Sequence, residues 1–450
     1  MVNRLVLDQD VQVLLKPRWR SALFLLALGL AGGLLAYDAV RVAWAQTLAR
    51  SFNFADLQKA RTLDPDNPEI LRQLGLHYAF SSEEYNPQKG REFLHRAVDL
   101  SPHTASYWKD LAKVCDSQKD TACADQAYDH ARALQPMMPG LEWTVANYYL
   151  QTERVDAALQ AFQHLLTMDP QYSWQVFHLC VGVTDDPLLV YEKVLPPGGD
   201  PLVELKYVDF LSEEDRWDSA YQVWGRIAAS IAPFKFSSIE PYLNHLLERG
   251  RIREAQTVWL DLQRLRVIPK PEVESHGSLI YNGGFERLPL AAGFDWRFVR
   301  TTYLSLDFAA PSAYQGSRCL RVDFTVARNE EYEPVYQIVP VIANQTYLLA
   351  AYTRSEDITS DSGPRMRVVD VSCAGCPSAF SETTIGTSAW HPVSVKFTTG
   401  PETQAVRVGV WRPRSRTFPV EIKGSFWLDD ISMKPLDSSG GSLSLAKSPS

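Results

Sequence analysis

Three patterns of hydrophobic and polar positions follow one another along the chain. The first is an apolar stretch without a charge at residues 22–37, close to the shortest length that spans a bilayer as a helix. From about residue 50 to 268, apolar residues recur at the three- and four-residue spacing of amphipathic helices. After residue 278 they alternate with polar residues, as in half-buried β-strands. The chain is therefore predicted to be multidomain, with a membrane helix, an all-α region and an all-β region.

The apolar stretch predicts a transmembrane signal-anchor helix over residues 21–40. Only Arg41 follows it closely, whereas four basic residues precede it, and this bias places residues 1–20 in the cytoplasm; the four are Arg4, Lys16, Arg18 and Arg20. A cleaved signal peptide is the alternative, because residues 43–45 (Ala-Trp-Ala) have the small-x-small form of a cleavage site. Asp38 stands before that site and favours the uncleaved anchor. Both interpretations export the rest of the chain.

A proline-terminated segment recurs in the helical region. Each copy has Leu or Met, then a polar residue, then proline, and the prolines are 37, 34 and 34 residues apart: Pro65, Pro102, Pro136 and Pro170. Between the second and third prolines, small, large and aromatic residues match the pattern of the tetratricopeptide repeat; these are Trp108, Leu111, Ala112, Ala124, Tyr128 and Ala131. In such repeats small residues let paired helices approach, and large residues fill the space between hairpins.

Residues 46–268 thus resemble a tetratricopeptide-type α-solenoid of five to six hairpins, although residues 171–200 fit the pattern poorly. The aromatic and leucine positions are interpreted as core. The resemblance implies a groove that holds a protein or peptide, but the period itself identifies no partner.

Polar segments delimit the β region. Residues 269–278 contain two prolines and predict a linker, and the Ser- and Gly-rich residues 437–450 predict a disordered tail. Between them, residues 279–436 show several short strands separated by turn residues, which indicates a two-sheet sandwich. Residues 347–352 are continuously apolar and predict a strand buried on both faces.

Motifs at both ends of the sandwich carry a second resemblance. Asn282-Gly-Gly-Phe-Glu286, Asp295-Trp296 and the stretch 313–320 resemble the opening of galactose-binding-like jelly rolls, which include the carbohydrate-binding modules of xylanases. Residues 426–432 resemble the close of that pattern. Residues 351–365 are similar to a segment of bacterial envelope proteins that join tetratricopeptide arrays to such a domain. These resemblances imply a bacterial inner-membrane protein with its bulk in the periplasm.

Charge and motif content narrow the function classes. The formal net charge of −8 does not favour nucleic acid as a partner, because that mode of binding needs a clustered basic surface. The sequence has no G-x-S-x-G elbow, phosphate-binding glycine loop or H-E-x-x-H, so we expect a non-enzymatic protein. Among six cysteines, Cys373 and Cys376 have C-x-x-C spacing in a loop, which favours a loop-closing disulfide over redox chemistry.

Candidate ligand-binding residues come from the sandwich. Sugars present an apolar ring face and a fork of hydroxyls, so aromatic and arginine side chains are the candidates: Tyr352, Arg354, Arg365, Arg367, Trp411 and Arg412. A core or interface role for Trp411 is the alternative. The jelly-roll resemblance places two ligands of a structural calcium at Glu286 and Asp429, which could equally be uncoordinated surface carboxylates.

Together these observations predict an exported, membrane-anchored scaffold. Its repeats would bind a protein partner and its sandwich a glycan, and the resemblance implies a role in exopolysaccharide assembly or export. Two alternatives stay open: a purely protein–protein assembly factor whose sandwich binds no sugar, and a polysaccharide-modifying enzyme with an unrecognised site.

Overall fold

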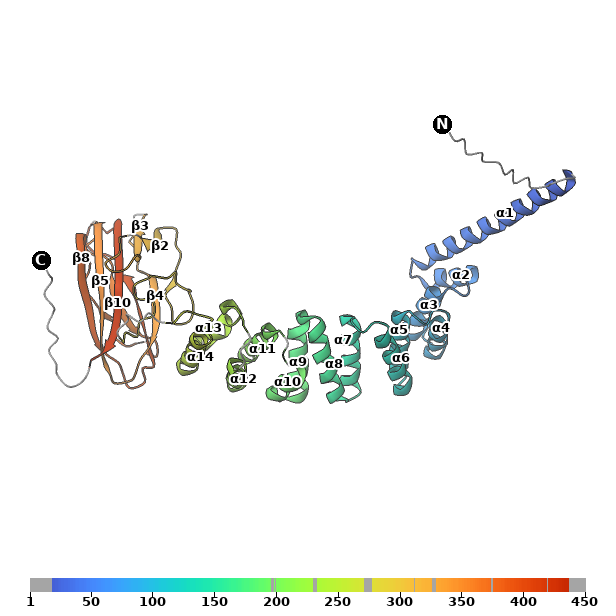
Figure 1. Cartoon of the computed structure of the whole chain (residues 1–450), viewed down its shortest axis with the longest axis horizontal. Coiled ribbons are helices and arrows are strands. Elements are labelled where there is room, and N and C mark those ends of the chain that lie inside the picture. Colours follow the sequence, from blue (N-terminus) through green and yellow to red (C-terminus); the bar gives the residue numbers. More distant parts are fainter. Residues whose placement is uncertain are drawn as a thin grey trace, which may run out of the picture. The chain divides into compact units, whose positions relative to one another are not determined.

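A computed structural model describes residues 18–195, 198, 200–229, 233–270, 277–310, 312–325, 329–373, 375–418 and 420–436. The predicted tail, nearly all of the predicted cytoplasmic segment and the middle of the predicted linker lie outside these residues. The chain divides into two compact units, Met1–Tyr172 and Ser173–Ser450. The division falls inside the predicted solenoid, at the start of the stretch where the repeat pattern is weakest. Figure 1 shows the helices followed by the strands.

The first helix is longer than the predicted membrane segment. α1 runs from Arg18–Ala49, and Ala22–Ala49 is long and apolar enough to cross a membrane. A signal sequence has the same signature, and the candidate cleavage site lies within this helix. The last turns of α1 are buried against the next helix through Ala45 and Ala49. This packing explains why the helix continues beyond residue 40.

The rest of the first unit consists of helical hairpins. Its helices are α2 (Phe54–Leu63), α3 (Pro68–Phe80), α4 (Pro87–Leu100), α5 (Ala105–Ser117), α6 (Thr121–Leu134), α7 (Pro139–Gln151) and α8 (Val155–Met168). Each of the four repeat prolines stands two residues after a helix end, as the period predicts. The next helices begin at capping residues or prolines, and Asn67 accepts hydrogen bonds from the first-turn N–H groups of α3.

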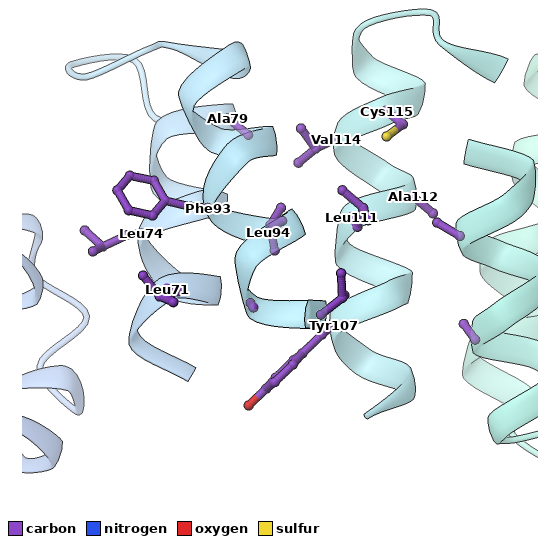
Figure 2. Close-up of a cluster of buried hydrophobic side chains, with 14 of the residues drawn as sticks. Leu71, Leu74, Ala79, Phe93, Leu94, Tyr107, Leu111, Ala112, Val114 and Cys115 are labelled. Atoms are coloured by element: carbon purple, nitrogen blue, oxygen red, sulfur yellow. The ribbon is translucent and has the colours of Figure 1, made fainter. Parts of the chain in front are cut away.

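Close helix approach depends on the small residues of the repeat. A Cβ atom on Gly75 would lie 2.7 Å from Leu94 Cγ, and one on Gly90 would lie 2.7 Å from the Gly75 carbonyl oxygen. Figure 2 shows Leu94 and Leu111 among the buried side chains packed between neighbouring helices. The repeat's leucine, alanine and tyrosine positions are therefore core, as predicted.

The second unit begins with more helices: α9 (Ser173–Thr184), α10 (Pro187–Val194), α11 (Pro201–Glu213), α12 (Trp217–Ala229), α13 (Glu240–Glu248) and α14 (Ile252–Arg264). The poorly fitting stretch 171–200 forms a hairpin of α9 and the eight-residue α10. The described residues thus contain six hairpins, from α3/α4 to α13/α14.

Ten strands form the sandwich: β1 (Arg297–Phe298), β2 (Leu304–Ala310), β3 (Cys319–Phe324), β4 (Tyr332–Pro340), β5 (Thr346–Ile358), β6 (Arg365–Asp370), β7 (Ala379–Phe380), β8 (Gly386–Thr398), β9 (Ala405–Arg412) and β10 (Gly424–Pro435). We call the sheet with order β1-β4-β9-β6-β7 sheet A, and the sheet with order β2-β3-β10-β5-β8 sheet B. Neighbouring strands pair antiparallel. The described residues therefore confirm the predicted fold class.

The core between the sheets follows the alternating positions. Val406, Val408 and Val410 of β9 belong to one buried cluster, together with Leu320, Val322 and Phe324 of β3. The continuous apolar run at residues 347–352 does not predict burial correctly. Its odd-numbered residues are buried in the core, whereas its even-numbered residues face the other way and are half-buried. Alternation along β5 decides burial here, because only one face of sheet B lines the core.

The sandwich packs against the last helical hairpin within the second unit. Trp259 of α14 contacts the rings of Tyr281 and Phe294 at centroid distances of 5.3 and 5.9 Å. Arg297 Nη2 donates to Asn244 Oδ1 of α13 at 2.8 Å. Gly293 has a φ of +59° and lies so close to Trp259 that a Cβ atom would be 2.3 Å from the indole. The predicted linker therefore joins two parts that contact each other.

Candidate functional site

The outer face of sheet A gathers three of the six predicted ligand-binding residues. Trp411 lies on β9, and Arg365 and Arg367 lie on the neighbouring strand β6. Because side chains alternate along a strand, all three point away from the valine positions of the core. Arg365 is the register partner of Trp411, and Phe380 of β7 is the register partner of Arg367. We call these four residues the Trp411 platform.

The rings and guanidinium groups of the Trp411 platform lie over one another. The centroids of the Trp411 and Phe380 rings are 4.9 Å apart. The Arg365 guanidinium carbon is 5.1 Å from the Trp411 centroid and 5.2 Å from the Phe380 centroid. The Arg367 guanidinium carbon is likewise 5.1 Å from the Trp411 centroid. Such cation–π contacts hold the guanidinium planes in place.

Two glutamates border the Trp411 platform: Glu333 of β4 and Glu331, which lies just before that strand. The Trp411 indole N–H donates to Glu331 Oε1 at 3.0 Å. Glu333 forms an ion pair with Arg407 of β9, with Oε2 and Nε 3.1 Å apart. Burial raises the pKa of the Glu333 carboxyl above its usual value, and the charge of Arg407 opposes that rise. Both glutamates therefore already have a partner within the sheet.

Gly409 lies between Arg407 and Trp411 on this face. A Cβ atom there would be 2.6 Å from the Val335 carbonyl oxygen and 2.9 Å from Tyr336 Cβ. The missing side chain lets β4 and its tyrosine lie close to β9. Sequence reasoning did not identify Gly409, Phe380, Glu331 or Glu333 as part of a site. Of these, Phe380 had only the weak signal of an aromatic residue after a loop.

Arg365 is the least compensated cation of the platform. Its Nε is buried and has no hydrogen-bond partner among the described residues. Burial lowers the pKa of the Arg365 guanidinium. Arg367, by contrast, directs Nε and Nη2 toward Ser378 Oγ, each at 3.3 Å.

Two other predicted residues lie on the outer face of sheet B. Tyr352 of β5 stacks on Tyr314, with centroids 3.6 Å apart. Arg354 of the same strand lies over Trp427 of β10, with its guanidinium carbon 4.6 Å from the ring centroid. The opposite sheet thus carries an aromatic and arginine cluster of its own. The predicted residues do not form one site.

Arg412 is the sixth predicted residue, and the structure places it inside the sandwich. Its side chain is 1% exposed. Its guanidinium donates to the carbonyl oxygens of Ser362, Glu330 and Val420 at 3.0, 2.7 and 3.0 Å. The guanidinium therefore holds loops together and has no surface to offer a ligand. Side chains alternate along a strand, so Arg412 lies on the core side of β9 because the preceding Trp411 points outward.

The two residues predicted as calcium ligands accept hydrogen bonds from loop 313–318. Glu286 accepts from the backbone N–H groups of Ser317 and Arg318 at 2.7 and 3.1 Å. Asp429 Oδ2 accepts from the N–H groups of Tyr314 and Gln315 at 2.8 and 3.0 Å. Each carboxylate therefore holds this loop through two backbone N–H donors. No group of three His, Cys, Asp or Glu side chains within the described ranges could hold a metal ion.

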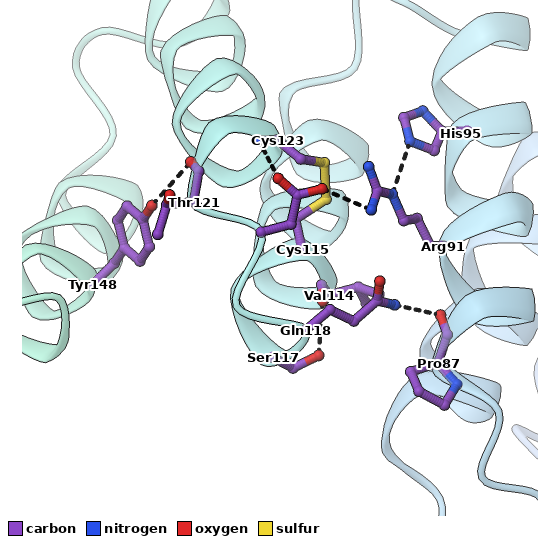
Figure 3. The surroundings of a disulfide bond; sticks show 11 residues. Pro87, Arg91, His95, Val114, Cys115, Ser117, Gln118, Thr121, Cys123 and Tyr148 are labelled. Carbon is purple, nitrogen blue, oxygen red and sulfur yellow. Dashed lines mark hydrogen bonds and ion pairs between the residues drawn. A yellow bond between two sulfur atoms is a disulfide. The ribbon is translucent and has the colours of Figure 1, made fainter.

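Two disulfides lie in the described residues. Cys373 and Cys376 are joined in the loop between β6 and β7, with Cα atoms 5.5 Å apart. Cys115 and Cys123 are also joined, and Figure 3 shows this bond linking the end of α5 to the start of α6. The second pair was not predicted; its eight-residue separation across a helix–helix turn was the available signal. Cys180 and Cys319 are free and buried.

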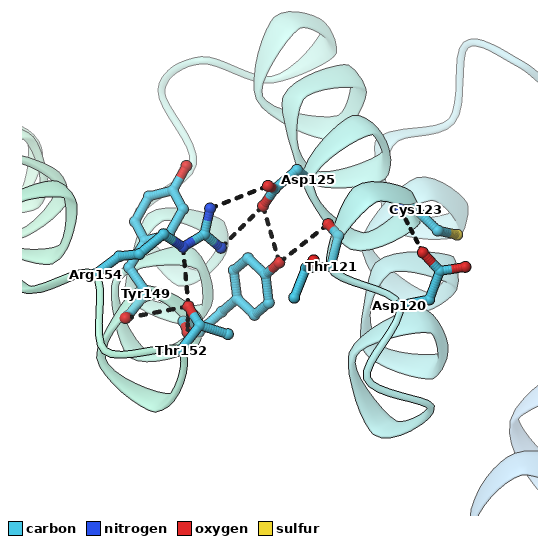
Figure 4. Close-up of polar contacts among 8 residues, drawn as sticks. Asp120, Thr121, Cys123, Asp125, Tyr149, Thr152 and Arg154 are labelled. Carbon is cyan, nitrogen blue, oxygen red and sulfur yellow. Dashed lines mark hydrogen bonds and ion pairs between the residues drawn. The ribbon is translucent and has the colours of Figure 1, made fainter.

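A hollow on the first unit is the candidate protein-binding surface. It is lined by residues of α5, α6 and α7, including Lys113, Asp116, Trp143 and Asn147. Beside it, Tyr148 donates to Asp125 Oδ1 at 2.8 Å, and Arg154 holds both oxygens of that carboxylate at 3.0 Å. Figure 4 shows this network joining α6 to the end of α7 and the start of α8. The network fixes the helices that border the hollow.

The known proteins that this chain resembles each match only a part of it. No protein-family model and no curated protein matches it. A structure of PilF from Pseudomonas aeruginosa is 22% identical and covers 44% of this chain and 91% of that one, with a TM-score of 0.25. A family 16 carbohydrate-binding module is 19% identical over 35% of this chain and 99% of that one, with a TM-score of 0.25. MamA is 17% identical over 40% of this chain and 94% of that one, with a TM-score of 0.30. At these values no ligand or residue role transfers to this chain.

The architecture itself matches the sequence-based expectation in both parts. In the described residues, helical hairpins come first, and a proline follows the second helix of several of them. A sandwich of ten strands in two antiparallel sheets comes after them. The chain therefore combines an array of tetratricopeptide-type helical hairpins with a jelly-roll sandwich of two antiparallel sheets.

Proposed function

We propose that this chain is an exported, non-enzymatic scaffold that binds a glycan through the Trp411 platform and a protein partner through its helical hairpins. The observation that carries the proposal is the grouping of Trp411, Phe380, Arg365 and Arg367 on one sheet face. Binding sites for small polar molecules combine aromatic surface with a few fixed hydrogen-bond donors. A sugar residue offers matching groups, because its C–H face suits aromatic rings and its hydroxyls suit guanidinium donors.

Membrane attachment by α1 and a position outside the cytoplasm are part of the proposal. The apolar stretch Ala22–Ala49 is preceded by basic residues, which favours a cytoplasmic N-terminus at a bacterial inner membrane. The disulfides Cys115–Cys123 and Cys373–Cys376 support an oxidising compartment such as the periplasm. An exported protein that binds glycan would suit the assembly or export of an exopolysaccharide.

A binding role is favoured over glycoside hydrolysis by the state of the acidic residues. Hydrolysis needs two carboxyl groups that face each other across a cleft and are free to act. On sheet A, Glu333 is paired with Arg407, and Glu331 accepts the Trp411 indole N–H. The hollow at Trp143 and Asn147 supports the second part of the proposal, a partner peptide bound by the helices.

The test is glycan-array screening of the full-length, detergent-solubilised chain, followed by calorimetry on the hits. We expect Trp411→Ala to abolish glycan binding without unfolding the sandwich. Trp390→Ala is the matched control, because Trp390 lies on β8 of sheet B. Equal loss from both variants, or no binding by the folded wild type, would contradict a glycan site on sheet A and favour the protein-only scaffold.

A further inference from the structure

The charged residues on the outer face of sheet A do not balance. Strands β6 and β9 and residues 331–333 contribute three arginines and two glutamates to this face, an excess of one positive charge around Trp411: Arg365, Arg367, Arg407, Glu331 and Glu333. Arg407 is paired with Glu333. Neither Arg365 nor Arg367 has a carboxylate oxygen within 4.0 Å among the described residues. The excess positive charge therefore lies on the Trp411 platform itself.

The outer face of sheet B shows that an arginine–tryptophan cluster can be built with charge balance. There, two guanidinium groups lie over the Trp427 ring, from Arg321 at 5.1 Å and Arg354 at 4.6 Å. Arg321 is paired with Asp323 at 2.8 Å, and Arg354 lies 3.8 Å from Glu356. Each carboxylate stands two residues beyond its arginine on the same strand. On β6 the corresponding position after Arg365 holds another cation, Arg367, instead of an acid.

A desolvated cation without a counter-ion is unfavourable, so an anionic ligand gains more from Arg365 than a neutral one does. Its buried, unpartnered Nε and its lowered pKa both reflect this lack of compensation. The arginines also cover the rings, with both guanidinium carbons 5.1 Å from the Trp411 centroid. A ligand approaching this face meets planar cations as well as aromatic surface. Guanidinium groups bind carboxylates through two parallel hydrogen bonds.

We propose that the glycan bound at the Trp411 platform is acidic, a polysaccharide with carboxylated sugar units whose carboxylate pairs with Arg365 and Arg367. This inference rests on the proposed function and adds the chemical class of the glycan. The carboxylate supplies the charge that sheet A lacks. The sugar ring lies beside Trp411 and Phe380, where its C–H groups contact aromatic carbon.

The test compares each acidic polymer with the same polymer after its carboxylate charges have been removed. The full-length chain in detergent is titrated with polygalacturonate, alginate and hyaluronate, and with each polymer after its carboxylates are methyl-esterified. We expect binding to at least one acidic polymer, weakening with added salt, and a loss of about tenfold or more on esterification. Arg365→Gln and Arg367→Gln should each cause a similar loss, whereas Arg354→Gln on sheet B should cause none.

The outcomes separate this inference from the proposed function. Equal binding of an acidic polymer and its ester would overturn the acidic specificity and leave glycan binding intact. Binding to none of these polymers while the glycan array finds neutral ligands would overturn the acidic specificity alone, and no binding on the array either would overturn both. An esterification loss that persists unchanged in the Arg365 and Arg367 variants would overturn the placement at sheet A. Polyglutamate that competes as strongly as the acidic glycan would overturn the assignment to a sugar and leave a general anion site.

Discussion

The guanidinium carbon of Arg365 lies 5.1 Å from the centre of the Trp411 ring, and the two residues are direct register partners in β6 and β9. Strand pairing creates this contact between residues far apart in sequence. Arg365 Nε has no hydrogen-bond partner among the described residues, and the guanidinium group lies over the rings of Trp411 and Phe380. Removing either residue therefore changes the environment of the other, and the two should act together in ligand binding.

Gly409 should tolerate no side chain. A Cβ atom would lie 2.6 Å from a β4 carbonyl oxygen, so Gly409→Ala must push β4 from β9. We expect a loss of about 1–3 kcal/mol in the free energy of unfolding, as for other overpacked sites. Urea unfolding measures it. Gly375→Ala is the control, because a Cβ atom there meets nothing within 4 Å. Equal stability of the two variants would contradict the close approach of the strands.

Arg412 should act on stability and not on ligand affinity. Arg412→Met removes the donors to three carbonyl oxygens that are buried or half-buried, and we expect a loss of about 3 kcal/mol or more in the free energy of unfolding. Arg412→Lys should rescue little, because one ammonium cannot reach all three acceptors. Thermal unfolding checks the loss. If the folded fraction of Arg412→Met binds glycan more weakly than wild type, Arg412 has a ligand-binding role after all.

Alternation along β9 indicates that Trp411 points away from the valine positions, but it does not indicate which residues surround Trp411. Alternation along β9 is a local property, so it can be recognised in a single strand. The platform depends on the order β9-β6-β7 within sheet A, which arises from long-range pairing. Phe380 lies in a two-residue strand, too short to show a period. Arg354 and Arg365 illustrate the same limit, because the sequence does not show that these two arginines lie on opposite sheets.

The helical region was more predictable because its contacts are local. Pro102 and Pro136 each follow a helix end, and the repeat places Ala112 in the packed core. Cys115–Cys123 was missed since the repeat pattern has no requirement for cysteine at either position. Arg412 is a ligand-binding candidate by residue type, but the alternation that directs Trp411 outward directs Arg412 inward.

Asp295 should make the sandwich less stable as the pH rises. Burial raises the pKa of this carboxyl to about 6, against the lowering effect of hydrogen bonds from the N–H groups of Leu290 and Trp296. A group whose pKa is higher in the folded than in the unfolded protein stabilises the folded state at a pH below its unfolded pKa. This contribution is lost as the pH rises to the folded pKa. The contribution from Asp295 should therefore fall by about 2–3 kcal/mol between pH 4 and 6.

The measurement for Asp295 is urea unfolding of wild type and Asp295→Asn at pH 4.5 and pH 7. Other groups titrate in both proteins, so the informative quantity is the difference between them. We expect wild type to lose more stability than the variant over this range. Parallel changes in the two proteins would mean that Asp295 has an ordinary pKa.

Glu286 should stabilise the sandwich without calcium. Burial alone would raise the pKa of the Glu286 carboxyl, but hydrogen bonds from Ser317 and Arg318 hold this pKa below its usual value. A lowered pKa means a contribution that is present at neutral pH and is lost in acid. Glu286→Gln should lower the melting temperature equally in chelator and in calcium. A wild-type melting temperature that rises with calcium, and does so only when Glu286 is present, would instead support the structural calcium site.

The Cys115–Cys123 disulfide should stabilise the α5/α6 hairpin. Closing a loop of this length restricts the unfolded chain by about 2–3 kcal/mol. Cys115→Ala/Cys123→Ala should therefore increase hydrogen exchange in α5 and α6 while leaving the strands unchanged, measured by mass spectrometry of peptides. The neighbouring contacts persist in the variant, since Gln118 Nε2 still donates to the Pro87 carbonyl oxygen and ties α5 to α4.

The matched control for that variant is Cys373→Ala/Cys376→Ala, which removes the short loop disulfide of the sandwich. It should leave exchange in the helices unchanged. Thiol labelling of the folded wild type should find Cys180 and Cys319 unreactive, because both are buried and burial raises the pKa of each thiol to about 12. Rapid labelling of Cys115 or Cys123 in protein isolated from the periplasm would contradict the disulfide and, with it, one of the two supports for an oxidising compartment.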